Sequence, residues 1–180
     1  MKKAILALAL LSCSVLANEK PNFSNVQLDN LQYAYQFGEQ FTKDGKYKTH
    51  ETRDVKGLGY IMAAIAWQES SAGVNTGKNK KKHHAYGVFQ NYLPTVRNRA
   101  AQNKWNLSDT EIKKMLSDRK HSARWAYIEL SYWLNIHNGD MRKAISSYNA
   151  GWNVKAGNKY ASQIIEKANY LKSHEMLISG

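Results

Sequence analysis

Apolar side chains recur at helical spacing along most of the chain, and this pattern predicts a mainly α-helical protein. The densest stretch runs from Leu58 to Trp67, where almost every residue is apolar, so the helix expected over 57–69 is buried on most sides. No stretch shows the convincing alternation that marks a half-buried strand. The stripes that predict the other helices are Leu28, Leu31, Tyr35 and Phe41; Ala123, Ala126, Tyr127, Leu130 and Leu134; Met141, Ala144, Ile145 and Tyr148; and Ala161, Ile164, Ile165, Ala168 and Leu171.

Proline and polar residues mark where several of these helices begin. Pro94 suits the first turn of a helix, because a residue there needs no backbone N–H donor. Ser108 and Glu111 have the Ser-x-x-Glu spacing of a capping box, which predicts the start of the next helix. Asp140 is the expected N-cap of the helix that follows it. The polar stretches between helices are 42–54, expected to be a loop or short hairpin, and 70–86, expected to be a loop.

The first residues have the pattern of an export signal. Lys2 and Lys3 precede a short apolar run, and Val15 and Ala17 suit a signal-peptidase cut after Ala17. The run is too short to favour a membrane span. Cys13 is the only cysteine, so a chain cut after Ala17 has neither thiol nor disulfide. Acylation of Cys13, which would anchor a lipoprotein to the membrane, is the alternative.

Charge narrows the choice of partners without fixing it. The formal net charge is +12, and removal of the leader with its two lysines leaves +10. An exported protein this basic is expected to meet an anionic partner such as cell-wall polymer, lipid head groups or nucleic acid. A lysine-rich surface without a specific partner fits equally well. The export signal argues against nucleic acid.

The apolar helix over 57–69 ends on a carboxyl group. Glu69 shares a helical face with Ile61 and Ile65, so it is expected to be partly desolvated, and desolvation raises the pKa of a carboxyl group. A carboxyl that keeps its proton near neutrality can act as a general acid. The alternative is a solvent-facing glutamate in the last turn, where its charge opposes the helix dipole.

Three short motifs follow one another in order. They are Glu69-Ser70-Ser71, Gly87-Val88-Phe89-Gln90 and Tyr148-Asn149-Ala150-Gly151. In this order, and behind an export signal, they resemble the motifs of the SLT-type lytic transglycosylases over roughly Leu58 to Leu171. The resemblance implies a mainly α, lysozyme-like single domain with few or no strands, preceded by a cleaved signal peptide. The implied organisation is a signal peptide over 1–17, an N-terminal helix and charged loop over 18–56, the catalytic domain over 57–172 and a tail over 173–180.

The resemblance also implies roles for individual residues. Glu69 is the implied catalytic residue, Tyr148 is expected to hydrogen-bond near it, and Asn149 is expected to shape the site. Val88 and Phe89 stand where the family has Leu and Met, which keeps the apolar character of the segment expected to line the sugar groove and leaves the shape of that groove open. Each residue also has an ordinary structural explanation, such as core packing for Tyr148. The residues that the resemblance assigns to substrate binding are Ser70, Ser71, Gly87, Phe89, Gln90, Tyr148 and Asn149.

The region after Glu69 holds no second acid. From Ser70 to Ser108 there is no Asp or Glu, whereas most glycosidases use two carboxylates, so a partner would have to come from a distant part of the chain. The family mechanism needs no second carboxylate. The resemblance implies that Glu69 protonates the glycosidic oxygen between N-acetylmuramic acid and N-acetylglucosamine. The sugar's N-acetyl group is then expected to stabilise the positive centre, and the 6-hydroxyl to close a 1,6-anhydro ring.

The sequence therefore predicts an exported peptidoglycan lytic transglycosylase in the periplasm or cell envelope. It is expected to act in wall turnover or in wall opening for a secretion, pilus or conjugation machine, without metal or cofactor. The alternatives are a hydrolytic muramidase on the same scaffold and a non-catalytic wall-binding protein. His83 and His84 lie among lysines without acidic or Cys neighbours, which favours a solvated loop over a metal site. Trp152, beside the third motif, is the tryptophan expected to stack on sugar.

Overall fold

A computed structural model describes residues 21–44, 58–76 and 84–177, with the side chains of 41–44 excepted. The predicted signal peptide, Cys13, His83 and most of the predicted charged loop lie outside the described residues. Within these ranges no helix has the combination of length and apolar character that crossing a membrane requires.

The described chain is mainly α, as predicted, with seven helices and one pair of very short strands. The strands pair antiparallel, with Ala85 opposite Tyr92 and Tyr86 opposite Asn91. In chain order the elements are α1 (Asn25–Asp44), α2 (Leu58–Ser70), β1 (Ala85–Tyr86), β2 (Asn91–Tyr92), α4 (Leu93–Gln102), α5 (Asp109–Ser117), α6 (Arg119–Ile136), α7 (Met141–Ala150) and α8 (Val154–Ser173).

The predicted helix starts are confirmed where a local cap specifies them. Ser108 accepts from the backbone N–H of Glu111 and the Glu111 side chain accepts in return, which completes the capping box of α5. Asp140 accepts from the N–H of Lys143 at 3.0 Å and caps α7. Pro94 lies in the first turn of α4. The region 70–86, expected to be a loop throughout, contains β1 at its end.

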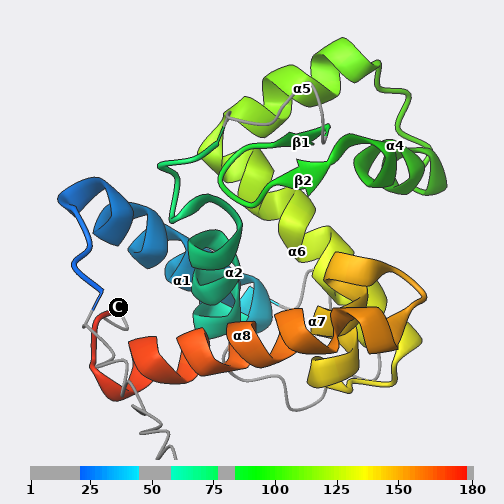
Figure 1. Ribbon diagram of the computed structural model, residues 1–180. Coiled ribbons are helices and arrows are strands. Elements are labelled where there is room, and N and C mark those ends of the chain that lie inside the picture. The colour runs from blue at the N-terminus through cyan, green and yellow to red at the C-terminus, as the bar shows by residue number, and fades with distance from the viewer. Residues whose placement is uncertain (1–20, 45–57, 77–83, 178–180) are drawn as a thin grey trace, which may run out of the picture.

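Helix α6 links two groups of elements (Figure 1). On one side are the hairpin, α4 and α5, and on the other are α1, α2, α7 and α8. Each group has its own apolar core, and α6 contributes to both, with Trp125 in the smaller core and Leu130 in the larger. Both groups therefore pack on the same helix.

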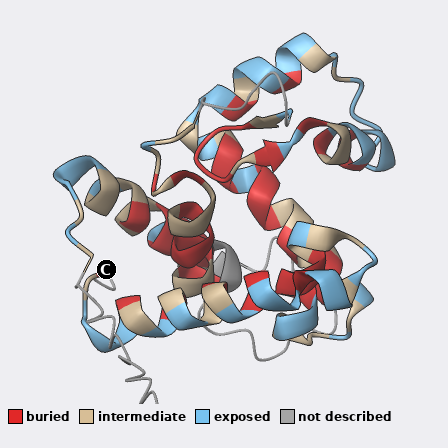
Figure 2. Cartoon of the chain, viewed as in Figure 1, coloured by how far each residue is buried: buried red, intermediate tan, exposed pale blue. Residues whose placement is uncertain are grey.

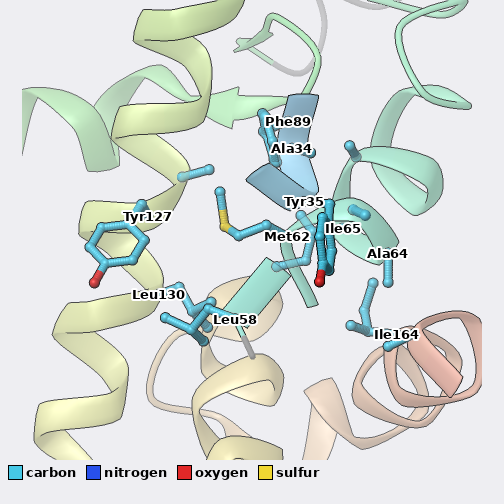
Figure 3. Close-up of a cluster of buried hydrophobic side chains, with 14 of the residues drawn as sticks. Ala34, Tyr35, Leu58, Met62, Ala64, Ile65, Phe89, Tyr127, Leu130 and Ile164 are labelled. Atoms are coloured by element: carbon cyan, nitrogen blue, oxygen red, sulfur yellow. The ribbon is translucent and has the colours of Figure 1, made fainter. Parts of the chain in front are cut away.

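Helix α2 lies at the centre of the larger core. Met62 and Ile65 are fully buried, and they face residues of α1, α6 and α8 such as Tyr35, Leu130 and Ile164 (Figure 3). Figure 2 shows that buried residues cover most of α2, whereas α5 and α8 alternate buried and exposed faces. A helix apolar on nearly all sides must be enclosed by neighbours, and this confirms the expectation for 57–69.

Candidate functional site

Glu69 lies in the last turn of α2, at the wall of a pocket of about 130 Å³. Because the helix before it is enclosed by the larger core, the Glu69 carboxyl group emerges from an apolar environment. The pocket is also lined by Gln90, Tyr148 and Asn149, so three residues of the second and third motifs meet Glu69 there. Segments far apart in the sequence therefore form one site.

The Glu69 carboxyl group is about half protonated at neutral pH. Burial raises its pKa to about 7, and the rise expected from the helix pattern is confirmed. A hydrogen bond from the Tyr160 hydroxyl to Oε1 of Glu69, 2.5 Å long, acts in the opposite direction because it stabilises the carboxylate. A group poised in this way can donate a proton and later accept one.

Two tyrosines stack beside the acid. The rings of Tyr148 and Tyr160 are 6.5 Å apart and inclined by only 12°. Burial, followed by the nearby Glu69 charge, raises the pKa of both hydroxyls well above the usual value, so both remain donors. The Tyr148 hydroxyl donates to the carbonyl of Phe89 at 3.4 Å, and the direct bond to the acid comes from Tyr160.

Tyr160 was not among the residues that the sequence analysis assigned to the site. Helix α8 begins at Val154, seven residues before the apolar stripe that predicts it, and Tyr160 immediately precedes the first residue of that stripe. Asn153 caps the helix by accepting from the N–H of Ala156, and an Asn before a helical stretch is the signal that was available.

Ser70 fixes the end of α2. Its side chain is 1% exposed, its Oγ donates to the carbonyl of Val88 at 2.6 Å, and it accepts from the N–H of Gly73 at 2.8 Å. These bonds tie α2 to the Gly87–Gln90 segment and to the turn that follows. Ser70 therefore positions backbone around Glu69 and presents almost no surface to a ligand.

The turn after Ser70 has an unusual backbone. Ser71, Ala72 and Gly73 all have positive φ, at 51°, 52° and 96°. Helix α1 holds this turn, because Gln27 Nε2 donates to the Ser71 carbonyl at 3.0 Å and Asn30 Nδ2 donates to that of Ala72 at 2.9 Å. Ser71 thus contacts α1, and it does not line the Glu69 pocket in the described part of the chain.

The second motif forms the turn between β1 and β2. Gly87 has a φ of 77°, and a Cβ there would lie 2.2 Å from the Leu116 carbonyl oxygen. Phe89 is fully buried in the larger core, so its carbonyl, and not its ring, faces Tyr148. Gln90 reaches the pocket, with its Nε2 donating to the Gly87 carbonyl at 2.8 Å. The segment therefore contributes the Gln90 amide to the pocket and the Phe89 carbonyl as an acceptor for Tyr148.

A second carboxylate enters the pocket from α6. Glu129 lines it together with Glu69, although 60 positions separate them in the sequence. Arg99 donates two hydrogen bonds to this carboxylate, from Nε to Oε2 at 2.8 Å and from Nη2 to Oε1 at 3.1 Å. Trp133 Nε1 adds a third bond, to Oε1 at 2.6 Å. Both oxygens of Glu129 are therefore committed to protein donors.

The pocket continues into a larger one of about 700 Å³, and together they form a groove. Aromatic side chains from α6 and from the turn after α7 line this extension, among them Tyr132, Trp133 and Trp152. The residues that line both pockets are Tyr92, Thr95, Arg99, Glu129, Tyr148 and Asn149. The groove runs between the two groups of elements that α6 links.

His84, the described member of the predicted histidine pair, is exposed. Over 21–44, 58–76 and 84–177 there is no group of three or more His, Cys, Asp or Glu side chains placed to hold a metal ion.

The chain is similar to a protein of Enterobacteria phage T4 described as "Uncharacterized 20.7 kDa protein in vs-regB intergenic region". The two are 67% identical over 178 residues, which is 98% of this chain and 97% of the phage protein. No protein-family model matches the chain, and no solved structure matches it. Identity of this extent shows common descent over the whole length, and the description carries no activity with it.

Proposed function

The chain belongs to the family of the 20.7 kDa vs-regB intergenic protein of Enterobacteria phage T4, and for this family member we propose the activity of an exported peptidoglycan lytic transglycosylase. The observation that carries the proposal is the state of Glu69: a partly buried carboxyl with a pKa of about 7, bonded to Tyr160, on the wall of a groove. The proposed fold of residues 57–172 is lysozyme-like.

The proposed reaction begins with proton transfer from Glu69 to the glycosidic oxygen between N-acetylmuramic acid and N-acetylglucosamine. The carbon–oxygen bond breaks, and the substrate's own N-acetyl group stabilises the positive charge that develops at C1. The Glu69 carboxylate then takes the proton of the muramyl 6-hydroxyl while that oxygen bonds to C1. The enzyme regains its proton, the product ends in a 1,6-anhydro ring, and no water is consumed.

The environment of Glu129 supports a single-acid mechanism. Three of the roughly four acceptor sites of the Glu129 carboxylate are occupied by donors of Arg99 and Trp133, and the Arg99 cation balances its charge. This arrangement favours a structural role for the second acid. The presence of Glu129 in the same pocket is also the observation that favours the second candidate, a hydrolytic muramidase with two carboxylates.

The proposed location is the periplasm or cell envelope, with membrane attachment only if Cys13 is lipidated. The proposed ligand is the peptidoglycan glycan strand, and the proposed task is wall turnover or wall opening for a secretion, pilus or conjugation apparatus. A relative in a phage of enterobacteria fits local wall opening, because a phage must pass the wall of its host.

The test is digestion of purified sacculi in heavy-oxygen water, followed by mass spectrometry of the released muropeptides. The proposal expects 1,6-anhydro ends without heavy oxygen, and Glu69→Gln is expected to lower their release by about a hundredfold or more. Glu166→Gln, at an exposed position of α8, is the matched control and is expected to leave release unchanged. Reducing ends that carry heavy oxygen would favour the muramidase. Binding to sacculi without any release would favour a wall-binding protein.

A further inference from the structure

Trp152 places an exposed indole beside the groove extension. Its side chain is 72% exposed, the largest value among the exposed large apolar residues of the described chain. Gly151, with φ 60° and ψ −132°, ends α7 and turns the backbone just before it. A single exposed apolar residue is common on protein surfaces. This one belongs to the lining of a pocket that continues from the acid, which sets it apart from a residue on an open face.

The residues behind Trp152 hold it in a fixed frame. Its ring meets Trp133 edge to face, with centroids 5.0 Å apart and an interplanar angle of 82°. Trp133 is stacked on His137 at 5.9 Å, and its Nε1–H bonds to Glu129. The guanidinium of Arg99, which pairs with Glu129, lies 3.3 Å from the ring centre of Tyr132. These contacts join the extension to the pocket of Glu69 through shared side chains.

The lining of the extension suits a neutral ligand with an apolar face and a polar edge. Arg99 and Glu129 are the only charged side chains among its described lining residues, and they neutralise each other. An anionic peptide stem or phosphate polymer would need an unpaired cation. Asn98, Gln102 and Asn149 add polar groups around the aromatic wall. A pocket that combines aromatic surfaces with several placed polar groups can fix the orientation of a small polar ligand.

We propose that the pocket containing Trp152 is a sugar-binding subsite that takes a neutral N-acetylhexosamine unit of the glycan strand. The C–H face of the pyranose ring packs on the indole, and its hydroxyl and acetamido groups meet the amide side chains. This inference rests on the proposed function, since continuity with the pocket of Glu69 makes the bound unit part of the strand that Glu69 cleaves. The subsite gives the enzyme a preference for strands long enough to reach Trp152.

The test measures binding of a length series of peptide-free N-acetylglucosamine oligomers to the Glu69→Gln protein by titration calorimetry. Affinity is expected to rise with length and then to level off. Adding Trp152→Ala is expected to remove the rise and to weaken binding of the longest oligomers about tenfold or more, the loss typical of an aromatic binding residue. Binding of the shortest oligomers is expected to remain unchanged, and Trp152→Phe is expected to keep part of the rise.

Trp105→Ala is the matched control, because Trp105 is also exposed and also packs edge to face on another tryptophan, Trp125, but does not line the groove. It is expected to leave every affinity unchanged. Equal affinity of the parent and Trp152→Ala proteins for all oligomers overturns the inference, as does a parent that binds none of them. Circular dichroism melting verifies that each variant folds. Trp152-dependent binding together with no release from sacculi would leave the subsite standing and overturn the proposed function.

Discussion

The hydroxyl of Tyr160 donates to Oε1 of Glu69 at 2.5 Å, although the two residues lie 91 positions apart. The bond joins α8 to the last turn of α2, and it affects both the orientation and the pKa of the Glu69 carboxyl group. It holds the carboxyl group in one orientation, and it lowers a pKa that burial raises. The balance of these opposing effects leaves the pKa at about 7, where one group can serve as acid and base.

Tyr160→Phe is expected to shift the alkaline limb of the pH–rate profile to higher pH. Without the hydrogen bond the carboxylate loses its stabilisation, so the pKa of Glu69 rises and the proton is retained further into the alkaline range. Turnover at neutral pH is expected to fall about tenfold to a hundredfold, because the acid is less well oriented. The measurement is muropeptide release against pH. Tyr170→Phe, on the same helix and with its ring stacked on His174, is the control. A limb that stays in place in Tyr160→Phe would contradict the account.

Glu69→Gln is expected to stabilise the protein most at alkaline pH. The folded-state pKa of about 7 lies above the ordinary 4.5, so the folded protein binds more protons between these values. Stability is therefore fully present below about pH 4.5 and falls as the pH rises through 7, by about 3 kcal/mol in total. The glutamine amide of the variant does not ionise, so the variant does not lose this stability as the pH rises. Denaturant unfolding of both proteins at about pH 5 and pH 8 measures the effect. An advantage for Glu69→Gln that shrinks toward alkaline pH would rule out the raised pKa.

Ser70→Ala is expected to destabilise the fold by about 2 kcal/mol or more, because it leaves the buried Val88 carbonyl and the partly buried Gly73 N–H without the partner that Ser70 provides. The matched control is Ser117→Ala, since the Ser117 hydroxyl also bonds to a backbone carbonyl but lies on the surface. That variant is expected to change stability by less than about 0.5 kcal/mol. Similar losses in the two variants, measured by urea unfolding, would show that Ser70 does not tie α2 to its neighbours.

Local signals allowed some elements to be predicted, and long-range pairing determined the others. The caps at Ser108 and Asp140 involve residues only three positions apart, so the starts of α5 and α7 can be predicted from the sequence. The burial of Glu69 followed from an apolar helix that has to be enclosed. The hairpin was missed because strands of two residues show no alternation. It depends on Asn91, whose Nδ2 bonds to the distant Ser122.

The two missed side chains of the site illustrate the same limit. Glu129 lies between Tyr127 and Leu130 on a core helix, and nothing local indicates that it turns toward the groove. Its orientation comes from Arg99, 30 positions earlier. Tyr160 precedes the stripe of its helix and is directed by packing on Tyr148. Motifs located the acid, but the groups that tune or surround it come from segments that no local pattern joins.

Gly87→Ala is expected to be far more harmful than Gly151→Ala. Both glycines have positive φ, so an alanine at either position costs about 1–3 kcal/mol in backbone strain. At Gly87 the new Cβ would also lie 2.2 Å from the Leu116 carbonyl oxygen and 2.4 Å from Ser122 Oγ. At Gly151 no atom lies within 4 Å. Thermal unfolding of both variants measures the difference. Equal losses would show that backbone conformation alone explains the glycine of the second motif.

Removing one partner of the Arg99–Glu129 pair is expected to cost more than removing both. The side chains are only 10% and 13% exposed, so either charge left alone is poorly solvated, and each single variant is expected to lose about 3–5 kcal/mol. Arg99→Met and Glu129→Gln make the two singles, and the glutamine keeps an acceptor for Trp133 Nε1. The double variant is expected to recover much of the loss, because no charge remains buried.

The parent protein, the two single variants and the double variant form a double-mutant cycle. It distinguishes the effect of the Arg99–Glu129 pair on stability from its effect on the pKa of Glu69. In Arg99→Met the Glu129 carboxylate faces the pocket of Glu69 without its cation, and a like charge raises the pKa of Glu69 further. The alkaline limb of activity is therefore expected to move to higher pH in Arg99→Met, and to return once Glu129→Gln is added. Unfolding free energies of the four proteins give the coupling between the pair, and their pH profiles give its effect on the acid. Additive losses of stability, with four identical profiles, would mean that the pair neither holds the groove wall nor acts on Glu69.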